Sequence, residues 1–381
     1  MQDVGKPGDP DYLLRHLDHT TCLFGVGRRP RRAPTGLEQA VVSFVHSKPG
    51  ANIRQIQDSS PHLKTWTHTE MRDLVVGLVD AGALDVVGYA PLVEVDPRYE
   101  TVPYCDLCHA PSNEHPIAFW KYNTPVVRCT GCGLLYSNPR WRAEHLFGRY
   151  TPEFWQQYAD GVRSTATDRA ANQARWDPYL DTLESARANG RLLDVGCATG
   201  EFLSAARVRG WEVYGVEPSP IASKMAEQAT GGRIYTGTLD TVPFADGWFD
   251  AVTLWDVIEH VQSPSAYIAQ VARLVRQGGM VALTTPNIRS IAYRLLGARW
   301  HAVGPNDHIY YFSPRTMQRL LALNGFNIHV LHTAGNKPET WEKWLRLPVL
   351  RWLAAPMSNL TQPLARRFLW GDELYVVGRR A

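Results

Sequence analysis

The 381-residue sequence has no uninterrupted run of about 18 apolar residues, the length that a helix needs to cross a bilayer. Its first residues, Met1 to Pro10, are polar and include no apolar core of a signal peptide. The formal net charge is only +3, which is too small to require a polyanionic partner. We therefore expect a soluble globular protein with neither a signal peptide nor a spanning helix.

Cysteine is scarce, because six residues in a chain of this length are too few for a disulfide scaffold. Four of them, Cys105, Cys108, Cys129 and Cys132, form two CxxC pairs about twenty residues apart, the spacing of a zinc ribbon. Four thiolates leave no open position for a substrate, so the predicted zinc is structural. Unligated thiols, a redox pair and rubredoxin-like iron are the alternatives. Thiol ligands favour a reducing compartment, and we expect a cytoplasmic protein.

The chain is longer than a typical single domain, so several folding units are expected. We predict three units: an N-terminal module at 1–98, a four-cysteine unit at 99–145 and a C-terminal domain at 146–381. In the last unit strand and helix patterns alternate, which predicts a mostly parallel sheet covered on both faces. Seven strands are expected, at Leu192–Val195, Glu212–Val216, Arg233–Tyr235, Ala251–Trp255, Val281–Thr285, Ile328–His332 and Leu374–Val377.

Start and stop signals for helices lie between these strands. Helices are expected to start after Gly200 and at Ser219, Ser263 and Ser313. Three of them are expected to end at Gly210, Gly278 and Gly325.

Residues 1–98 contain two amphipathic helices, because apolar residues recur at helical spacing over 37–45 and 71–79. A capping box at Thr67 starts the second helix, and a strand pattern follows it at 84–87. This order predicts a small winged-helix-like module. It resembles, in outline, the domains that bind leader peptides on enzymes acting on ribosomally made peptides.

Nucleic-acid binding is the alternative for this module. A basic cluster precedes its first strong helix, formed by Arg28, Arg29, Arg31 and Arg32. No helix shows an excess of base-reading residues, so we expect a solvated loop there and no nucleic-acid partner.

The segment from Asp194 to Gly200, DVGCATG, ends the first strand of the third unit and opens into a helix. Its small residues let the backbone pass close beneath a ligand, and the helix N-terminus offers amides to an anion. At the end of the second strand, Glu217 can accept hydrogen bonds from both hydroxyls of a ribose. A dinucleotide fold would show GxGxxG here, so the pattern favours S-adenosylmethionine.

These residues resemble the class I S-adenosylmethionine-dependent methyltransferases. The resemblance covers residues 185–381 through LLDVGCATGEFL, FDAVTLWDVIEHV, TTPN and HIYYFSPRTMQRLLALNGF. Upstream, CDLCHA and VVRCTGCGLLYSNPR look like the zinc ribbon that often precedes such domains in bacteria. The resemblance implies a seven-stranded Rossmann-like α/β domain that follows a zinc ribbon and the N-terminal module.

The resemblance also implies roles for single residues. Cys197 stands where glycine or alanine is common, and we expect a small buried side chain. Tyr158 would belong to a lid over the cofactor, with aromatic packing as the alternative. The implied cofactor residues are Asp194, Gly196, Cys197 and Gly200 in the loop, Glu217 and Pro218 at the ribose, Thr238 and Leu239 at the adenine, Trp255 and Asp256 beneath the methyl group, and Tyr158.

Methyl transfer needs a nucleophile in line with the sulfonium methyl group, and a base if the nucleophile is protonated. His308 is the first candidate base, because a neighbouring acid could raise its basicity and Tyr310 could orient an acceptor hydroxyl. His260 is the second. Both histidines could instead satisfy backbone groups. Glu259 is expected to be a solvated or capping carboxylate.

An insertion at about 337–371 mixes tryptophan with arginine, which suits either a membrane surface or, as we favour, a helical lid or dimer contact. The expected function is methylation of oxygen, nitrogen or carbon in a small-molecule or peptide natural-product intermediate. A nucleotide-linked deoxysugar or glycan is the alternative substrate. A further alternative is a DNA-binding regulator that senses adenosylmethionine.

Overall fold

The computed structural model covers the whole chain, and most of it can be described. The described residues are 22–26, 34, 36–49, 51, 53–66, 68–81, 83–89, 97–121, 124–146, 150–163, 166–188, 190–335, 365 and 367–381. The arginine cluster at 28–32, the cap at Thr67 and most of the insertion at 337–371 lie outside these residues.

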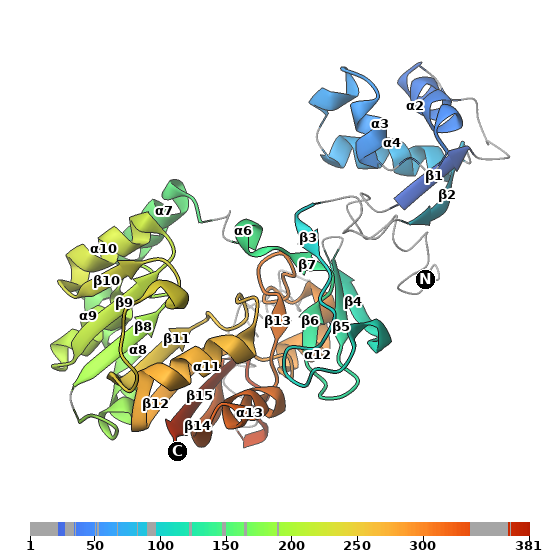
Figure 1. The fold of residues 1–381 in the computed structure, drawn as a ribbon. Helices are drawn as coiled ribbons and strands as arrows, with labels where there is room; N and C mark the ends of the chain where they lie inside the picture. Colours follow the sequence, from blue (N-terminus) through green and yellow to red (C-terminus); the bar gives the residue numbers. More distant parts are fainter. Residues whose placement is uncertain are drawn as a thin grey trace, which may run out of the picture.

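The C-terminal part of the chain forms a seven-stranded sheet of order β10-β9-β8-β11-β12-β15-β14 (Figure 1). Six strands run parallel, and β15 is antiparallel to both of its neighbours. The α/β Rossmann-like fold and all seven predicted strands are confirmed. The strands are β8 Arg191–Val195, β9 Glu212–Glu217, β10 Arg233–Thr236, β11 Phe249–Trp255, β12 Val275–Pro286, β14 Phe326–Ala334 and β15 Glu373–Arg380.

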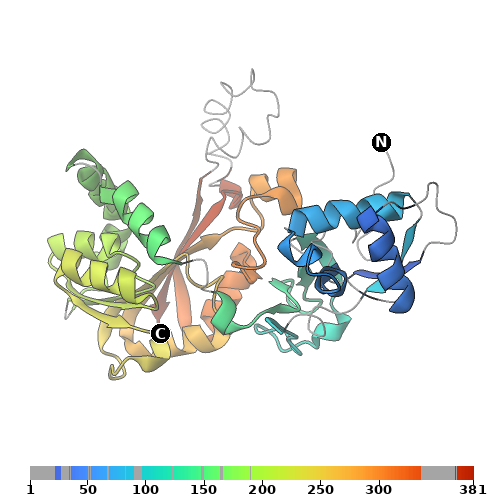
Figure 2. The same cartoon turned by 90° about the horizontal axis from the view of Figure 1, so that it is seen from above.

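Helices cover both faces of this sheet (Figure 2). Three predicted starts are confirmed, because Ser219, Ser263 and Ser313 each accept a hydrogen bond from a backbone amide of the first turn. The helices are α7 Pro152–Arg163, α8 Ala166–Glu184, α9 Glu201–Val208, α10 Pro220–Thr230, α11 Pro264–Leu274, α12 Ile291–Leu296 and α13 Pro314–Leu323, with the short 3-10 turns η3 Leu239–Thr241 and η4 Gly297–Arg299.

One predicted helix end is wrong. Helix α11 ends at Leu274, whereas Gly278 lies within β12. Gly278 still adopts a left-handed conformation, with φ of +75°. The glycine therefore marks an irregularity at the start of the strand, and the helix ends one residue before extended backbone begins at Val275.

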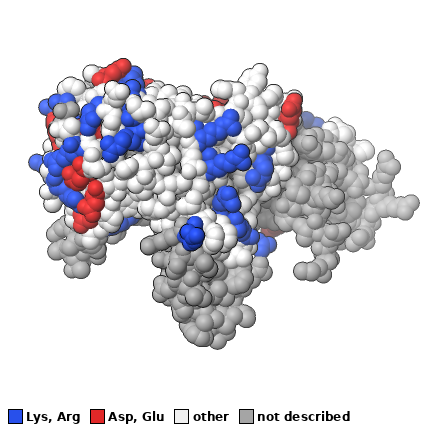
Figure 3. Space-filling model, turned by 90° about the horizontal axis from the view of Figure 1, so that it is seen from below, with Lys and Arg blue, Asp and Glu red and all other residues white. Residues whose placement is uncertain are grey.

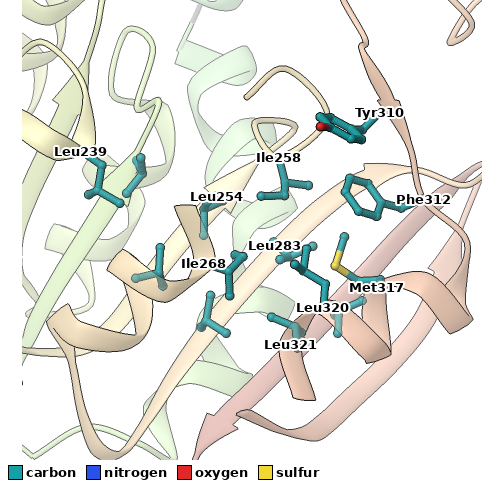
Figure 4. Close-up of a cluster of buried hydrophobic side chains, with 14 of the residues drawn as sticks. Leu239, Leu254, Ile258, Ile268, Leu283, Tyr310, Phe312, Met317, Leu320 and Leu321 are labelled. Atoms are coloured by element: carbon teal, nitrogen blue, oxygen red, sulfur yellow. The ribbon is translucent and has the colours of Figure 1, made fainter. Parts of the chain in front are cut away.

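The sheet is apolar on both faces because its side chains alternate. In β15, Leu374 and Val376 belong to one buried cluster, while Tyr375 and Val377 belong to the other. Helices α11 and α13 close the first cluster, and α8, α9 and α10 close the second. Figure 4 shows the first cluster, where side chains from β11, β12, α11 and α13 meet.

The cysteine unit forms a four-stranded sheet of order β13-β6-β5-β4. Its last strand along the sheet, β13, comes from the C-terminal part of the chain, so the two parts share one sheet. A two-stranded pair and a short helix connect this unit to α7. The elements are β3 Tyr99–Glu100, η2 Ser112–Glu114, β4 Ile117–Lys121, β5 Thr124–Arg128, β6 Leu135–Ser137, β7 Arg140–Trp141, α6 Ala143–Leu146 and β13 Tyr310–Tyr311.

The N-terminal unit packs three helices around its own buried cluster. The two predicted helices are confirmed close to their expected positions, as α2 Gly36–Ser47 and α4 His68–Asp80. A third helix, α3 Ile53–Asp58, and the turn η1 Leu63–Thr65 lie between them. The predicted strand is β2 Leu84–Tyr89, and it pairs with an antiparallel strand that was not predicted, β1 Cys22–Val26. Among the described residues, no helix is long and apolar enough to span a membrane.

Candidate active site

The loop that follows β8 requires glycine at two positions. Gly196 has φ of +72°, and a Cβ there would lie 2.7 Å from Cγ2 of Val257. Gly200 has φ of +85°, and its Cβ would lie 3.1 Å from Cα of Ala226 in α10. Without a side chain at Gly196, the loop can pack closely against Val257. Gly200 allows α9 to begin close against α10.

Glu217 ends β9 and faces this loop. One carboxylate oxygen accepts a hydrogen bond from the Ala198 amide at 3.0 Å, and the other accepts one from the Ser219 amide at 2.9 Å. The residue is 5% exposed, and burial raises the pKa of Glu217 although both amides lower it. Because a carboxylate has about four acceptor sites, it can hold two further donors.

A cavity of about 950 Å³ lies at the carboxyl ends of β8, β9 and β11, where ligands bind in open α/β sheets. Its lining comes from the loop after β8, from α7, from the start of α11 and from Asp307 and His308. The predicted site residues that line it are Gly196, Glu217, Pro218, Thr238, Trp255, Asp256, Tyr158, His260 and His308.

Other predicted cofactor residues lie behind the cavity wall. Asp194 is 2% exposed and accepts a hydrogen bond from the Thr253 hydroxyl at 2.7 Å. Leu239 points into the apolar cluster of Figure 4, and Asp240 lines the cavity in its place. Cys197 is buried, as expected for a small packing residue. Gly200 acts through helix packing.

Tyr310 was predicted to be a catalytic residue, but it lies outside the cavity lining. Its hydroxyl accepts a hydrogen bond from Arg140 at 2.9 Å and donates one to the Gln262 carbonyl at 3.2 Å. The side chain is 1% exposed within the sheet shared with the cysteine unit. These contacts give Tyr310 a structural place between the two units.

His260 and His308 face each other at the cavity, with ring centroids 4.7 Å apart. His308 has its Nδ1 2.8 Å from the Ala302 carbonyl. A carbonyl can only accept, so Nδ1 carries the proton and the neutral ring has its lone pair on Nε2. That arrangement suits a general base.

His260 is held differently. Its Nδ1 lies 2.9 Å from the Asp307 carbonyl and 3.2 Å from the Asp307 carboxylate. Burial alone would lower the pKa of His260, but the hydrogen bond to Asp307 and the charge of Glu259 raise it to about 9. At neutral pH this imidazole is therefore protonated and is not a base.

Glu259 is buried, contrary to the expectation of a solvated carboxylate. It is 1% exposed, and burial raises the pKa of Glu259 to about 8. The polar segment DVIEH does not predict this burial, because Glu259 meets a segment about fifty residues further along the chain. The Glu259 carbonyl accepts hydrogen bonds from the amides of Ile309 and Tyr310, which join the two segments.

Aromatic side chains from the start of α7 form one wall of the cavity. Tyr150 stacks on Trp155, and Phe154 stacks on Tyr158. All four line the cavity. Tyr158 therefore packs within an aromatic cluster that lines the cavity, and its role as a lid stays a prediction.

The four cysteines of the second unit converge on one point. The sulfur atoms of Cys105 and Cys132 are 3.6 Å apart, those of Cys108 and Cys129 are 3.4 Å apart, and all four lie within 4.8 Å of one another. A tetrahedron of thiolates about 2.3 Å from zinc has edges of about 3.8 Å. Gly131 leaves room for the sulfurs, since its Cβ would lie 3.2 Å from Sγ of Cys108. The donor set fits zinc.

A second cavity of about 470 Å³ adjoins the first. The two cavities share Leu146, Asp307 and His308 in their linings. Trp141 lines the second cavity, and its indole nitrogen is buried without a hydrogen-bond partner. His308 therefore lies at the junction of two neighbouring cavities.

Comparison with known proteins finds matches for part of the C-terminal half of the chain. Residues 168–331 match the model of a methyltransferase domain. A ubiquinone biosynthesis O-methyltransferase of Dechloromonas aromatica is 33% identical over 144 residues, which cover 35% of this chain and 62% of that protein. An uncharacterized methyltransferase of Mycobacterium sp. (strain JLS) is 35% identical over 142 residues, which cover 36% and 55%. The chain thus spans less than two thirds of these relatives.

Among solved structures, an S-adenosylmethionine-dependent methyltransferase of Thermotoga maritima, a possible histamine N-methyltransferase, has a TM-score of 0.44 at 19% identity. It covers 63% of this chain and all of its own. Magnesium protoporphyrin IX methyltransferase of Synechocystis, with bound S-adenosylhomocysteine, has a TM-score of 0.42 at 16% identity and covers 62% and 96%. Residues 168–331 thus match a methyltransferase domain model, and they lie in a sheet of Rossmann-like α/β order.

Proposed function

We propose that the protein catalyses methyl transfer from S-adenosylmethionine, with the ribose held by Glu217 and the methionine part against the loop at Gly196. The observation that carries this proposal is the position of Glu217, buried at the end of β9 and bordering the 950 Å³ cavity. The matched domain supports the same chemistry. The cofactor would supply an activated methyl group, and the protein would hold the acceptor in line with it.

His308 is proposed to accept the acceptor's proton. Its Nδ1 is tied to the Ala302 carbonyl, so Nε2 is the basic nitrogen. His260 is already protonated at neutral pH, and its role is to hold Asp307 and to offset the charge of the Asp307 carboxylate. The division of roles follows from the different partners of two adjacent rings.

The acceptor is proposed to enter through the second cavity, because His308 lies at its junction with the first. We propose a small-molecule or peptide natural-product intermediate, with a nucleotide-linked deoxysugar or glycan as the alternative. The relatives named as O-methyltransferases favour oxygen as the methylated atom.

The other two units keep their proposed roles, with boundaries at 1–98 and 99–145. The four-cysteine cluster is proposed to hold structural zinc, and its thiols favour the cytoplasm. The N-terminal unit is proposed to be winged-helix-like and to bind a leader peptide. Its antiparallel β1–β2 pair supports this, since a peptide can be added along a strand.

Calorimetry with S-adenosylhomocysteine tests the proposal. Micromolar binding is expected for the wild type, because such affinity is typical of these sites. Glu217→Ala should weaken binding at least tenfold, because the ribose loses a charge-assisted partner. Glu212→Ala is the matched control, since Glu212 begins the same strand as an exposed residue paired with Arg191. Equal affinities of the two variants would contradict the assignment.

A further inference from the structure

Asp106 of the cysteine unit contacts the wall of the cavity. Asp106 lies between Cys105 and Cys108 in the first CxxC pair. One oxygen of its carboxylate accepts a hydrogen bond from the Ser263 hydroxyl at 2.6 Å, and the other accepts one from the Ser265 amide at 2.8 Å. The Ser265 hydroxyl donates to the Asp106 carbonyl at 3.1 Å.

These contacts all lie at the start of α11. Ser263 is the N-cap of this helix, and the Ser265 amide belongs to its first turn, where amides have no partner within the helix. A carboxylate at this end also interacts favourably with the helix dipole. Asp106 therefore fixes the position and direction of the first turn.

The same turn is a wall of the cofactor cavity. Ser263, Ala266, Tyr267 and Gln270 of α11 and its cap all line the cavity. The side-chain amide of Gln270 donates a hydrogen bond to the Asp240 carboxylate. Asp240 lies in η3 and also lines the cavity. Contacts thus continue from the cysteine pair through α11 to the turn that we expect at the adenine.

A second contact holds the residue before the helix cap. Arg140 donates a hydrogen bond to the Gln262 carbonyl at 2.6 Å and pairs with Glu100 at 3.0 Å. The side-chain amide of Gln262 donates a hydrogen bond to the Trp141 carbonyl at 3.0 Å. The cavity wall is therefore held from two sides by the unit that carries the cysteines.

We propose that Asp106 is a positioning residue that links metal binding by the cysteines to cofactor affinity. A metal ion fixes the conformation of the CxxC turn, the turn fixes the Asp106 carboxylate, and the carboxylate fixes the wall formed by α11. Metal and cofactor then stabilise the same arrangement, and each raises the affinity for the other. This inference depends on the proposed binding of S-adenosylmethionine in the cavity.

Calorimetry with S-adenosylhomocysteine on the full chain tests the link. Asp106→Ala removes both hydrogen bonds to α11, and the dissociation constant should rise by about fivefold or more. Asp106→Asn can still accept from the Ser265 amide and donate to the Ser263 hydroxyl, so it should bind nearly as the wild type does. Asp246→Ala is the matched control, because exposed Asp246 pairs with Arg273 at the other end of α11.

Ser263→Ala tests the contact from the helix side and should also raise the dissociation constant. If Asp106→Ala does not fold, Ser263→Ala and the near-normal binding of Asp106→Asn decide the question. If it folds, the double variant should bind no more weakly than the weaker single variant. Additive losses, or unchanged affinity in Ser263→Ala, would overturn the link. A wild type that binds no cofactor would refute the proposed function itself, which is a separate outcome.

Removal of the metal gives an independent readout. Wild-type protein depleted of zinc by a chelator should bind S-adenosylhomocysteine with the weakened affinity of Asp106→Ala. In Asp106→Ala, depletion should change the dissociation constant by less than twofold. Unchanged affinity of the depleted wild type would show that the cysteine unit does not act on the cavity.

Discussion

At the scale of single residues, Glu259 and His260 keep their protons slightly above neutral pH, where the same side chains in the unfolded chain would have released them. The pKa of Glu259 is raised by burial from 4.5 to about 8. For His260, burial would lower the pKa, but Asp307 and Glu259 raise it from 6.5 to about 9. These two groups lie beside His308, so their protonation sets the charge of the candidate site.

The pH dependence of stability follows from these values. The folded chain keeps both protons to a higher pH than the unfolded chain does. The contribution of His260 is complete below pH 6.5 and is lost as the pH rises through about 9, and that of Glu259 is lost as the pH rises through about 8. The free energy of unfolding should therefore fall by about 1 kcal/mol or more between pH 6.5 and 9. Urea titrations at several pH values measure it.

Variants separate the contribution of the buried pair to this pH dependence from that of exposed titrating groups. Glu259→Gln removes one of the two protons and should flatten the slope between pH 6.5 and 8. Glu227→Gln changes an exposed carboxylate on α10 and should keep the wild-type slope. Identical slopes in all three proteins would mean that the buried pair does not retain its protons.

The candidate site shows which residue roles can be predicted from local sequence. Glu217 and Gly196 were predicted because a strand end and a glycine loop place them at the same edge of the sheet. Leu239 and Tyr310 lie outside the cavity lining, because their neighbours in sequence do not show which side chain turns toward the cavity. Glu259 is buried against the segment at Ile309 and Tyr310, which only the folded chain brings to it.

At the scale of elements, the strands were predicted more accurately than the connections between them. All seven strands of the large sheet have apolar patterns that match their buried faces, and serine caps fixed three helix starts. Strand β13 was not predicted, because two residues, Tyr310 and Tyr311, carry too little pattern. Its pairing with β6 joins the cysteine unit to the C-terminal part of the chain that carries the large sheet.

The cysteine cluster gives a prediction at this scale. Elemental analysis of the purified protein should find about one zinc per chain, and Cys129→Ser should abolish it because three thiolates and a hydroxyl hold zinc poorly. Cys197→Ser should retain the zinc, since this buried cysteine lies outside the cluster. Iron in place of zinc, or zinc retained by Cys129→Ser, would contradict the assigned site.

At the scale of the whole molecule, the basic side chains can be followed on one face of the surface. On the face shown in Figure 3, the lysine and arginine side chains of the described residues form several groups separated by uncharged side chains. Several arginines pair with nearby acids, such as Arg209 with Asp181 at 2.6 Å and Arg276 with Asp250 at 2.5 Å. The candidate functional groups of the described residues gather at the cavity and at the cysteine cluster.

The arrangement of units was only partly predictable. Composition and motif spacing separated the N-terminal unit, the cysteine unit and the sheet domain. The contacts that join them, such as those of Asp106 and Arg140, are single polar residues far apart in sequence. Hydrophobic periodicity carries no information about such pairs, so the link between the cysteine unit and α11 emerges only from the structure.

The central claim is that an S-adenosylmethionine nucleoside binds over the ends of β8 and β9. A crystal structure of the full chain with S-adenosylhomocysteine tests it most directly. The account predicts both ribose hydroxyls within hydrogen-bond distance of the Glu217 carboxylate, with the sulfur turned toward His308. A nucleoside bound elsewhere, or a cavity that accepts a dinucleotide instead, would contradict it.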